Sequence, residues 1–212
     1  MEISQIIDFL EAPGTRWGSR SHERVINNFD IQPYEFLRFA EQDLAAEYDH
    51  KLINALSNAK RALDSQVDTL LIGFDFYQQA KNKTWSFPKK LEIIQKLGIL
   101  APRVLRKINT TRNLMEHDFV KPQIDKVEDF VDITSLFLAS TDKYIMNLPG
   151  ECEFENDDHK DYWLRMNLDI EAPKLSVMVV SKVAENFEID FNSNHPDYLT
   201  LLKGYLRIGN AY

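Results

Sequence analysis

The chain has little of what disulfide-rich, fibrous or membrane-spanning proteins contain. Cys152 is the one cysteine among 212 residues, which excludes an internal disulfide framework and a zinc site built from several cysteines. Seven glycines and eight prolines are too few for a collagen-like or low-complexity chain. No apolar run approaches the roughly 18 residues that a membrane helix needs. We therefore expect a globular protein with no membrane partner.

The N-terminus, Met1 to Gln5, lacks the basic region of a secretory signal, so we expect a cytoplasmic location. The sequence also has no glycine-rich phosphate loop and no nucleophile elbow of the Gly-x-Ser-x-Gly type. The acidic run from Asp157 to Asp161 lacks the spacing of a metal-binding loop and is typical of a solvated turn. We therefore expect neither a cofactor nor a metal site.

Positive charge is scarce overall but concentrated in one segment. The whole chain has a net charge of −8, whereas residues 81–112 carry nine basic side chains against Glu92 alone. A basic block in an acidic chain is typical of a local site for a polyanion. The competing interpretation is that these cations balance acidic neighbours in the fold. The block consists of Lys81, Lys83, Lys89, Lys90, Lys96, Arg103, Arg106, Lys107 and Arg112.

A helical period dominates the middle of the chain. Apolar residues recur about every four positions from Tyr34 to Ile72 without a glycine or proline, which predicts one very long helix or two with a break near Asp49-His50. A loop is expected over residues 79–85, and a helix over 89–97 that Gly98 terminates.

Two more helices are predicted before the pattern changes. One follows Pro102 and runs to about Glu116, and the other reaches about Met146. Asp125 and Glu128 have the spacing of a capping box at the start of the latter. Residues 34–147 thus predict a bundle of four or five helices.

The period shortens to two after Leu148-Pro149-Gly150. Leu164, Met166 and Leu168 alternate with polar residues, and two more alternating segments follow. This predicts an antiparallel meander of three strands and a final helix from Pro196. The expected fold is mainly helical, and with its small strand-rich part it is α+β overall. Its three parts are an N-terminal extension (1–33), a helical bundle (34–147) and a small β-meander plus helix (148–212).

The end of the basic block combines two side chains that RNA cleavage without a metal would use. The imidazole of His117 can move a proton near neutral pH, and the guanidinium of Arg112 can hold a phosphate through paired hydrogen bonds. Asn113 lies four residues before His117, so on a helix it can hydrogen-bond the imidazole. Five positions correspond to about 140° around a helix, so Arg112 and His117 converge only if the helix ends there or a second subunit contributes.

A helical bundle with Arg-Asn-x-x-x-His late in the pattern resembles the HEPN domain (higher eukaryotes and prokaryotes nucleotide-binding). The resemblance covers residues 34–147 and includes Leu97-Gly98 ahead of the motif. It implies that Arg112, Asn113 and His117 form an RNase motif. It also implies a homodimer in which two motif helices face each other, and a setting in toxin–antitoxin systems or phage defence.

The reaction implied is attack of a ribose 2′-hydroxyl on the adjacent phosphate without a metal. His117 would act as general acid or base, Arg112 would stabilise the charge of the transition state, and Asn113 would orient His117 or the phosphate. The basic block would hold the RNA backbone. The residues expected to do so are Lys89, Lys90, Arg103, Arg106 and Lys107.

Simpler interpretations stay open at this point. Arg112 and Glu116 are four apart and can form an ordinary surface pair, and His117 can favour a helix C-terminus through the dipole alone. The alternative function is a HEPN-like module without catalysis that binds RNA or nucleotides or assembles with proteins. In that interpretation the strand-rich C-terminal segment is a docking surface for a protein partner.

Overall fold

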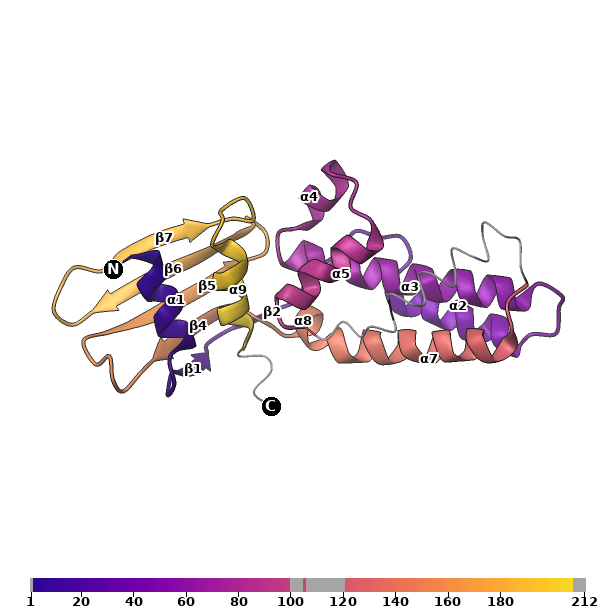
Figure 1. The fold of residues 1–212 in the computed structure, drawn as a ribbon, viewed down its shortest axis with the longest axis horizontal. Helices are drawn as coiled ribbons and strands as arrows, with labels where there is room; N and C mark the ends of the chain where they lie inside the picture. The colour runs from indigo at the N-terminus through magenta and orange to yellow at the C-terminus, as the bar shows by residue number, and fades with distance from the viewer. Residues whose placement is uncertain (1, 100–104, 106–120, 208–212) are drawn as a thin grey trace.

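The computed structural model describes residues 2–99, Leu105 and residues 121–207. Within them the protein is α+β, as the sequence predicts, and it has two lobes that lie end to end (Figure 1). One lobe is a sheet with two helices on it. The other is a set of helices inserted into that lobe between its first and second strands. In the described part of the chain, no helix is long and apolar enough to cross a membrane.

The sheet lobe is built on a five-stranded antiparallel sheet in the order β1-β4-β5-β6-β7. Its inner face is apolar because alternate residues of each strand point the same way, as with Leu164, Met166 and Leu168 of β5. Helices α1 (Ile3–Glu11) and α9 (Tyr198–Leu206) lie on the same face of the sheet. The strands are β1 (Arg16–Ser19), β4 (Glu151–Glu155), β5 (Tyr162–Asp169), β6 (Lys174–Ser181) and β7 (Phe187–Phe191).

The two ends of the chain belong to this one lobe. β1 pairs with β4 in a register that sets Trp17 opposite Phe154, and α1 packs beside α9. Gly204 permits this approach, because a Cβ there would lie 3.1 Å from Leu10. The sequence patterns predict that residues 1–33 and residues 148–212 form separate parts of the protein, whereas the structure joins their strands in one sheet. No periodicity within either segment reports this pairing.

The helical lobe centres on a long antiparallel hairpin of α2 (Pro33–Ala45) and α3 (Lys51–Gly73), against which α7 (Ile124–Thr141) and α5 (Phe87–Lys96) pack. The expected break near Asp49-His50 is confirmed. Leu56, Leu63 and Leu70 of α3, which are two helical turns apart, are buried on one face, as the helical spacing of the apolar residues predicts. The short helices are α4 (Tyr77–Asn82) and α8 (Lys143–Met146).

Two local expectations differ from the structure. Residues 77–82 form α4 within the stretch expected to be a loop, because Ala80 finds a buried position despite the polar sequence around it. Helix α7 begins at Ile124 after Gln123, so Asp125 and Glu128 lie inside the helix and do not form the expected capping box. Gly98 does end α5, with φ of +81°.

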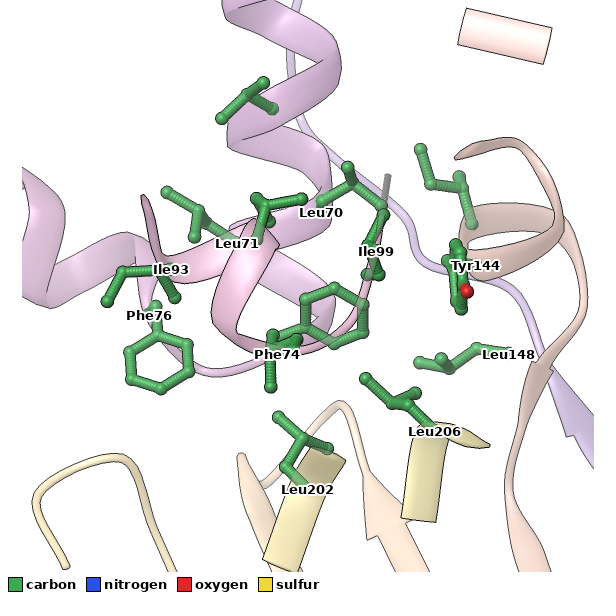
Figure 2. Close-up of a cluster of buried hydrophobic side chains, with 14 of the residues drawn as sticks. Leu70, Leu71, Phe74, Phe76, Ile93, Ile99, Tyr144, Leu148, Leu202 and Leu206 are labelled. Atoms are coloured by element: carbon green, nitrogen blue, oxygen red, sulfur yellow. The ribbon is translucent and has the colours of Figure 1, made fainter. Parts of the chain in front are cut away.

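A continuous apolar cluster joins the lobes (Figure 2). Phe74 at the end of α3 and Tyr144 of α8 face Leu202 and Leu206 of α9, and all four are buried. The Tyr198 hydroxyl donates to the Phe74 carbonyl over 3.2 Å, and the Asp75 carboxylate accepts from the Ser193 N–H over 3.0 Å. The lobes therefore share one hydrophobic core.

A two-stranded ribbon carries the chain between the lobes. β2 (His22–Glu23) leaves the sheet lobe beside β3 (Leu148–Pro149), which returns to it. The pairing continues into the helical lobe, where the Val25 N–H donates to the Ile145 carbonyl over 2.8 Å. The two crossing strands hold the inserted helices by a short, hydrogen-bonded neck.

Candidate functional site

The three motif residues, Arg112, Asn113 and His117, lie outside the described residues, as do Arg103, Arg106 and Lys107 of the expected RNA-binding set. Their segment follows Ile99, which is buried after α5, and precedes α7. Leu105, the one described residue between them, is fully buried. The roles assigned to the six residues stay predictions.

Lys89 and Lys90, the other two expected RNA-binding residues, begin helix α5 and point to different partners. Lys89 lies 3.0 Å from Glu92, and Lys96 reaches the same carboxylate over 2.7 Å. Lys96 and Lys89 together lower the pKa of Glu92 to about 2, so the carboxylate stays charged at neutral pH. The single acid of the basic block is thus held between two of its cations.

Lys90 is anchored more firmly. Its ammonium lies 2.6 Å from Asp68 of α3, and each side chain is only 19% exposed. Burial raises the pKa of Asp68 above its usual value, although Lys90 opposes the shift. This half-buried pair connects α5 to α3. Lys90 therefore helps to hold α5 against α3, which agrees with the interpretation that some cations of the block balance acidic neighbours.

The remaining described cations of the block are more open. Lys81 lies 5.5 Å from the ring centre of Tyr77, a cation–π arrangement at the surface. Lys83 is exposed and has no partner among the residues that the structure describes. Of the five described lysines, therefore, Lys81 and Lys83 are the ones left without an ion pair to a carboxylate.

A cavity of about 610 Å³ opens in the helical lobe, where the chain enters it from the neck, and we call it the junction cavity. Its walls are residues 24–27 and 32–34, Gln66 and Thr69 of α3, and Asp142, Ile145 and Met146 at the end of α7 and in α8. The volume falls in the range of small-molecule sites. No sequence pattern predicts this cavity, because its residues come from segments far apart in the chain and form no motif.

The walls of the junction cavity are fixed by hydrogen bonds between these segments. Asn27 donates to the Thr69 hydroxyl over 2.8 Å, and the Tyr34 hydroxyl donates to the Asp142 carboxylate over 2.6 Å. Burial and the neighbouring Asp142 raise the pKa of Tyr34 far above its usual value, so the phenol keeps its proton. The cavity is thus formed in advance of any ligand.

A second, smaller cavity of about 370 Å³ lies on the outer face of the sheet between β1 and β4. Its two arginines are paired: Arg20 lies 2.6 Å from Glu153, which Arg165 also reaches over 2.9 Å, and Arg16 lies 2.6 Å from Asp157. A ligand would have to displace these carboxylates to reach either arginine.

The described part of the chain has neither a candidate metal site nor a reactive thiol. No cluster of three or more histidine, cysteine or acidic side chains suited to a metal ion occurs there. Cys152 is fully buried in β4, and burial raises the pKa of its thiol to about 11. This thiol is therefore protonated and inert at neutral pH.

No protein-family model, curated protein or solved structure matches the chain.

Proposed function

We propose that the protein is a metal-independent endoribonuclease of the HEPN type that works as a homodimer. One observation carries the proposal: the motif Arg112-Asn113-x-x-x-His117 at the end of the basic block, in the chain segment between two helices of a helical lobe. The support from the fold is general. The hairpin of α2 and α3 with α5 and α7 packed on it is a helical assembly of the kind that the resemblance implies.

In this proposal His117 exchanges a proton with the ribose 2′-hydroxyl or with the leaving oxygen, and Arg112 stabilises the negative charge that develops on the phosphate. General acid–base catalysis by such a group is worth about 10²- to 10⁴-fold in rate. Asn113 fixes the tautomer or the orientation of the imidazole. RNA is the substrate, and the biological setting, toxin–antitoxin or phage defence in the cytoplasm, rests on the resemblance alone.

The backbone of the RNA is held by cations of the basic block. Among the described ones, Lys81 and Lys83 have no ion pair to a described carboxylate and are better suited to this role than Lys90, whose ammonium is held by Asp68. Arg103, Arg106 and Lys107, which lie outside the described residues, stay in the proposed set. Lys89 shares Glu92 with Lys96 at the surface, and such exposed pairs are weak enough to exchange for a phosphate.

The test is cleavage of a mixed-sequence RNA in EDTA by the wild type and by His117→Ala, Arg112→Ala and His50→Ala. His50 is an exposed histidine of the helical lobe outside the proposed site, so it provides the matched control. We expect cleavage by the wild type and by His50→Ala, and a loss of about 100-fold or more in the two motif variants. Absence of cleavage by the wild type, or equal cleavage by His117→Ala, would overturn the proposal.

Mixing variants tests the dimer. If Arg112 of one subunit works with His117 of the other, a heterodimer of Arg112→Ala and His117→Ala keeps one complete site. Random mixing then restores about a quarter of the wild-type activity, because half of the dimers are mixed and each has one of two sites. If both residues act within one subunit, the mixture stays inactive.

The second candidate function is a HEPN-like module that binds RNA or nucleotides, or assembles with proteins, without catalysis. The ion pairs of Lys89, Lys90 and Lys96 favour its protein-assembly form, because they leave fewer free cations for RNA in the described part of the basic block than the sequence suggests. Binding of RNA by an uncleaving wild type, measured by fluorescence anisotropy, would support this function. The possible protein partner of the C-terminal segment would then use the outer face of the sheet.

A further inference from the structure

Gln66 places an unsatisfied acceptor in the junction cavity. Its side chain is 2% exposed, and its amide nitrogen donates to the Thr141 hydroxyl over 2.9 Å and to the Leu138 carbonyl over 3.4 Å. Thr141 in turn donates to carbonyls of its own helix, at Phe137 or Leu138. The Leu138 carbonyl favours this orientation of the amide, because a reversed amide would bring its oxygen within 3.4 Å of that carbonyl.

The amide oxygen of Gln66 consequently faces the space inside the cavity. It has no hydrogen-bond partner among the residues that the structure describes. Every fully buried side-chain nitrogen and oxygen in this part of the chain does have a partner, so this oxygen must reach solvent. The junction cavity is the solvent-filled space that Gln66 lines. An acceptor that meets only solvent inside a cavity is a place where a ligand's N–H group can bind.

Two opposite charges line the same cavity without pairing. Asp142 accepts a hydrogen bond from Tyr34 but forms no ion pair with a described cation. Arg24 lies at the rim and has no hydrogen bond or ion pair with any described residue. The second cavity differs, because its arginines are paired with carboxylates. In the junction cavity the two charges stay available to a ligand.

The space between these groups has an apolar wall. Val25 and Ile145 are buried on the cavity's inner side, and Met146 is 45% exposed at its opening. Ile26 is 73% exposed beside them. Apolar side chains around a few polar groups of defined direction are the usual composition of a small-molecule site.

We propose that the junction cavity binds a small amphoteric molecule, with an amine or other N–H donor for Gln66 and Asp142, an anionic group for Arg24 and an apolar body between them. The two ends of such a ligand satisfy the three groups that the protein leaves open, and its body covers Val25, Ile145 and Met146. The binding site does not depend on the Arg112–His117 motif and exists whether or not the protein cleaves RNA.

Three probes of equal chain length separate the contributions. 6-Aminohexanoate carries both end groups, hexylamine carries the amine alone and hexanoate carries the anion alone. Their flexible chain lets each end find its partner. Titrated into the full-length protein and followed by calorimetry or NMR, 6-aminohexanoate should bind about fivefold or more tightly than either relative. Equal binding of all three, or no saturation of the wild type by about 50 mM, would overturn the proposal.

Variants locate the site. Arg24→Ala removes an exposed side chain without a partner, so the fold should persist while 6-aminohexanoate loses its advantage over hexylamine. Gln66→Leu should remove its advantage over hexanoate, with thermal unfolding as the check that the protein stays folded. Arg61→Ala, an exposed arginine of α3 that does not line the cavity, is the matched control and should bind as the wild type does. A loss in Arg61→Ala equal to that in Arg24→Ala would place the binding elsewhere and refute the site.

Discussion

The two lobes treat their polar groups differently. In the sheet lobe, buried hydroxyls and amides are paired: Tyr205 donates to the carbonyls of Pro149 and Gly150, and Asn156 donates to Pro13 and Thr15. In the helical lobe, Gln66 leaves an acceptor open, Arg24 and Asp142 lack counter-ions among the described residues, and Lys90 holds a half-buried carboxylate.

This difference indicates a division of labour. Every fully buried side-chain nitrogen and oxygen in the described part of both lobes has a partner, so the open groups are ones that reach solvent in a cavity, where a ligand can bind. The sheet lobe has the character of a scaffold that gathers both ends of the chain. The inserted helical lobe carries the open polar groups, the basic block and the motif segment. Both proposals accordingly concern the inserted lobe, and the following variants test whether the contrast holds.

The largest effect should come from separating the lobes. Phe74→Ala removes a fully buried ring where α3 meets α9, and such truncations cost about 3–5 kcal/mol of unfolding free energy. In urea, and in a Trp85→Phe background that removes the one tryptophan of the helical lobe, fluorescence of Trp17 and Trp163 reports on the sheet lobe. Far-UV circular dichroism reports mainly on the helices. The two transitions should coincide in the wild type and separate in the variant.

Leu136→Ala is the control for this experiment. The Leu136 side chain is 70% exposed on α7, so its loss should change the unfolding free energy by no more than about 0.5 kcal/mol. If Phe74→Ala lowers stability no more than Leu136→Ala does, the apolar cluster of Figure 2 does not couple the lobes.

A smaller loss is expected within the sheet lobe. Tyr205→Phe keeps the ring but removes the buried hydroxyl that donates to the carbonyls of Pro149 and Gly150, of which the Gly150 carbonyl keeps the Leu168 N–H as a donor. The cost should be about 1–3 kcal/mol, measured by urea denaturation. Tyr34→Phe is the comparison, because Tyr34 is 45% exposed and its acceptor, Asp142, can turn to water. An equal loss in both would remove the contrast between the lobes.

The smallest effect, and the one that depends on pH, concerns Lys90. Lys90→Met leaves Asp68 half-buried without its cation, which should cost about 1–2 kcal/mol at pH 7. Burial already raises the pKa of Asp68, and loss of Lys90 raises it further. The folded state then binds the proton more tightly than the unfolded state. The stability of the variant therefore falls as pH rises from the usual pKa of an aspartate to the raised pKa of Asp68. The variant should be closer to wild type at pH 4 than at pH 7.

The double variant Lys90→Met with Asp68→Asn isolates the charge. It should recover part of the unfolding free energy that Lys90→Met loses at pH 7. The pH dependence that Asp68 causes should disappear, because position 68 no longer titrates. If Lys90→Met instead weakens RNA binding while stability is unchanged at both pH values, Lys90 is an RNA contact, as the sequence suggested, and its pair with Asp68 is incidental.

Several elements were accessible from sequence because their signals are local. The helical spacing of Leu56, Leu63 and Leu70, each two turns from the next, predicted the long helix. The alternation of Leu164, Met166 and Leu168 with polar residues predicted β5. Gly98 marked a helix end through its positive φ. Residues 77–82 were misjudged because a short helix with one buried alanine has almost no periodic signal. The motif residues, too, were chosen on spacing alone, and their geometry stays a prediction.

The sequence by itself determined the α+β class, the helical middle and strand-rich end, the clustering of positive charge and the motif, because each follows from the order and spacing of nearby residues. Only the tertiary structure decided that β1 joins β4 across the inserted helices, that Lys90 faces Asp68, and that Arg24, Gln66 and Asp142 share one cavity. These groups are separated by tens of residues. Their meeting depends on how the chain packs as a whole, which no local pattern records.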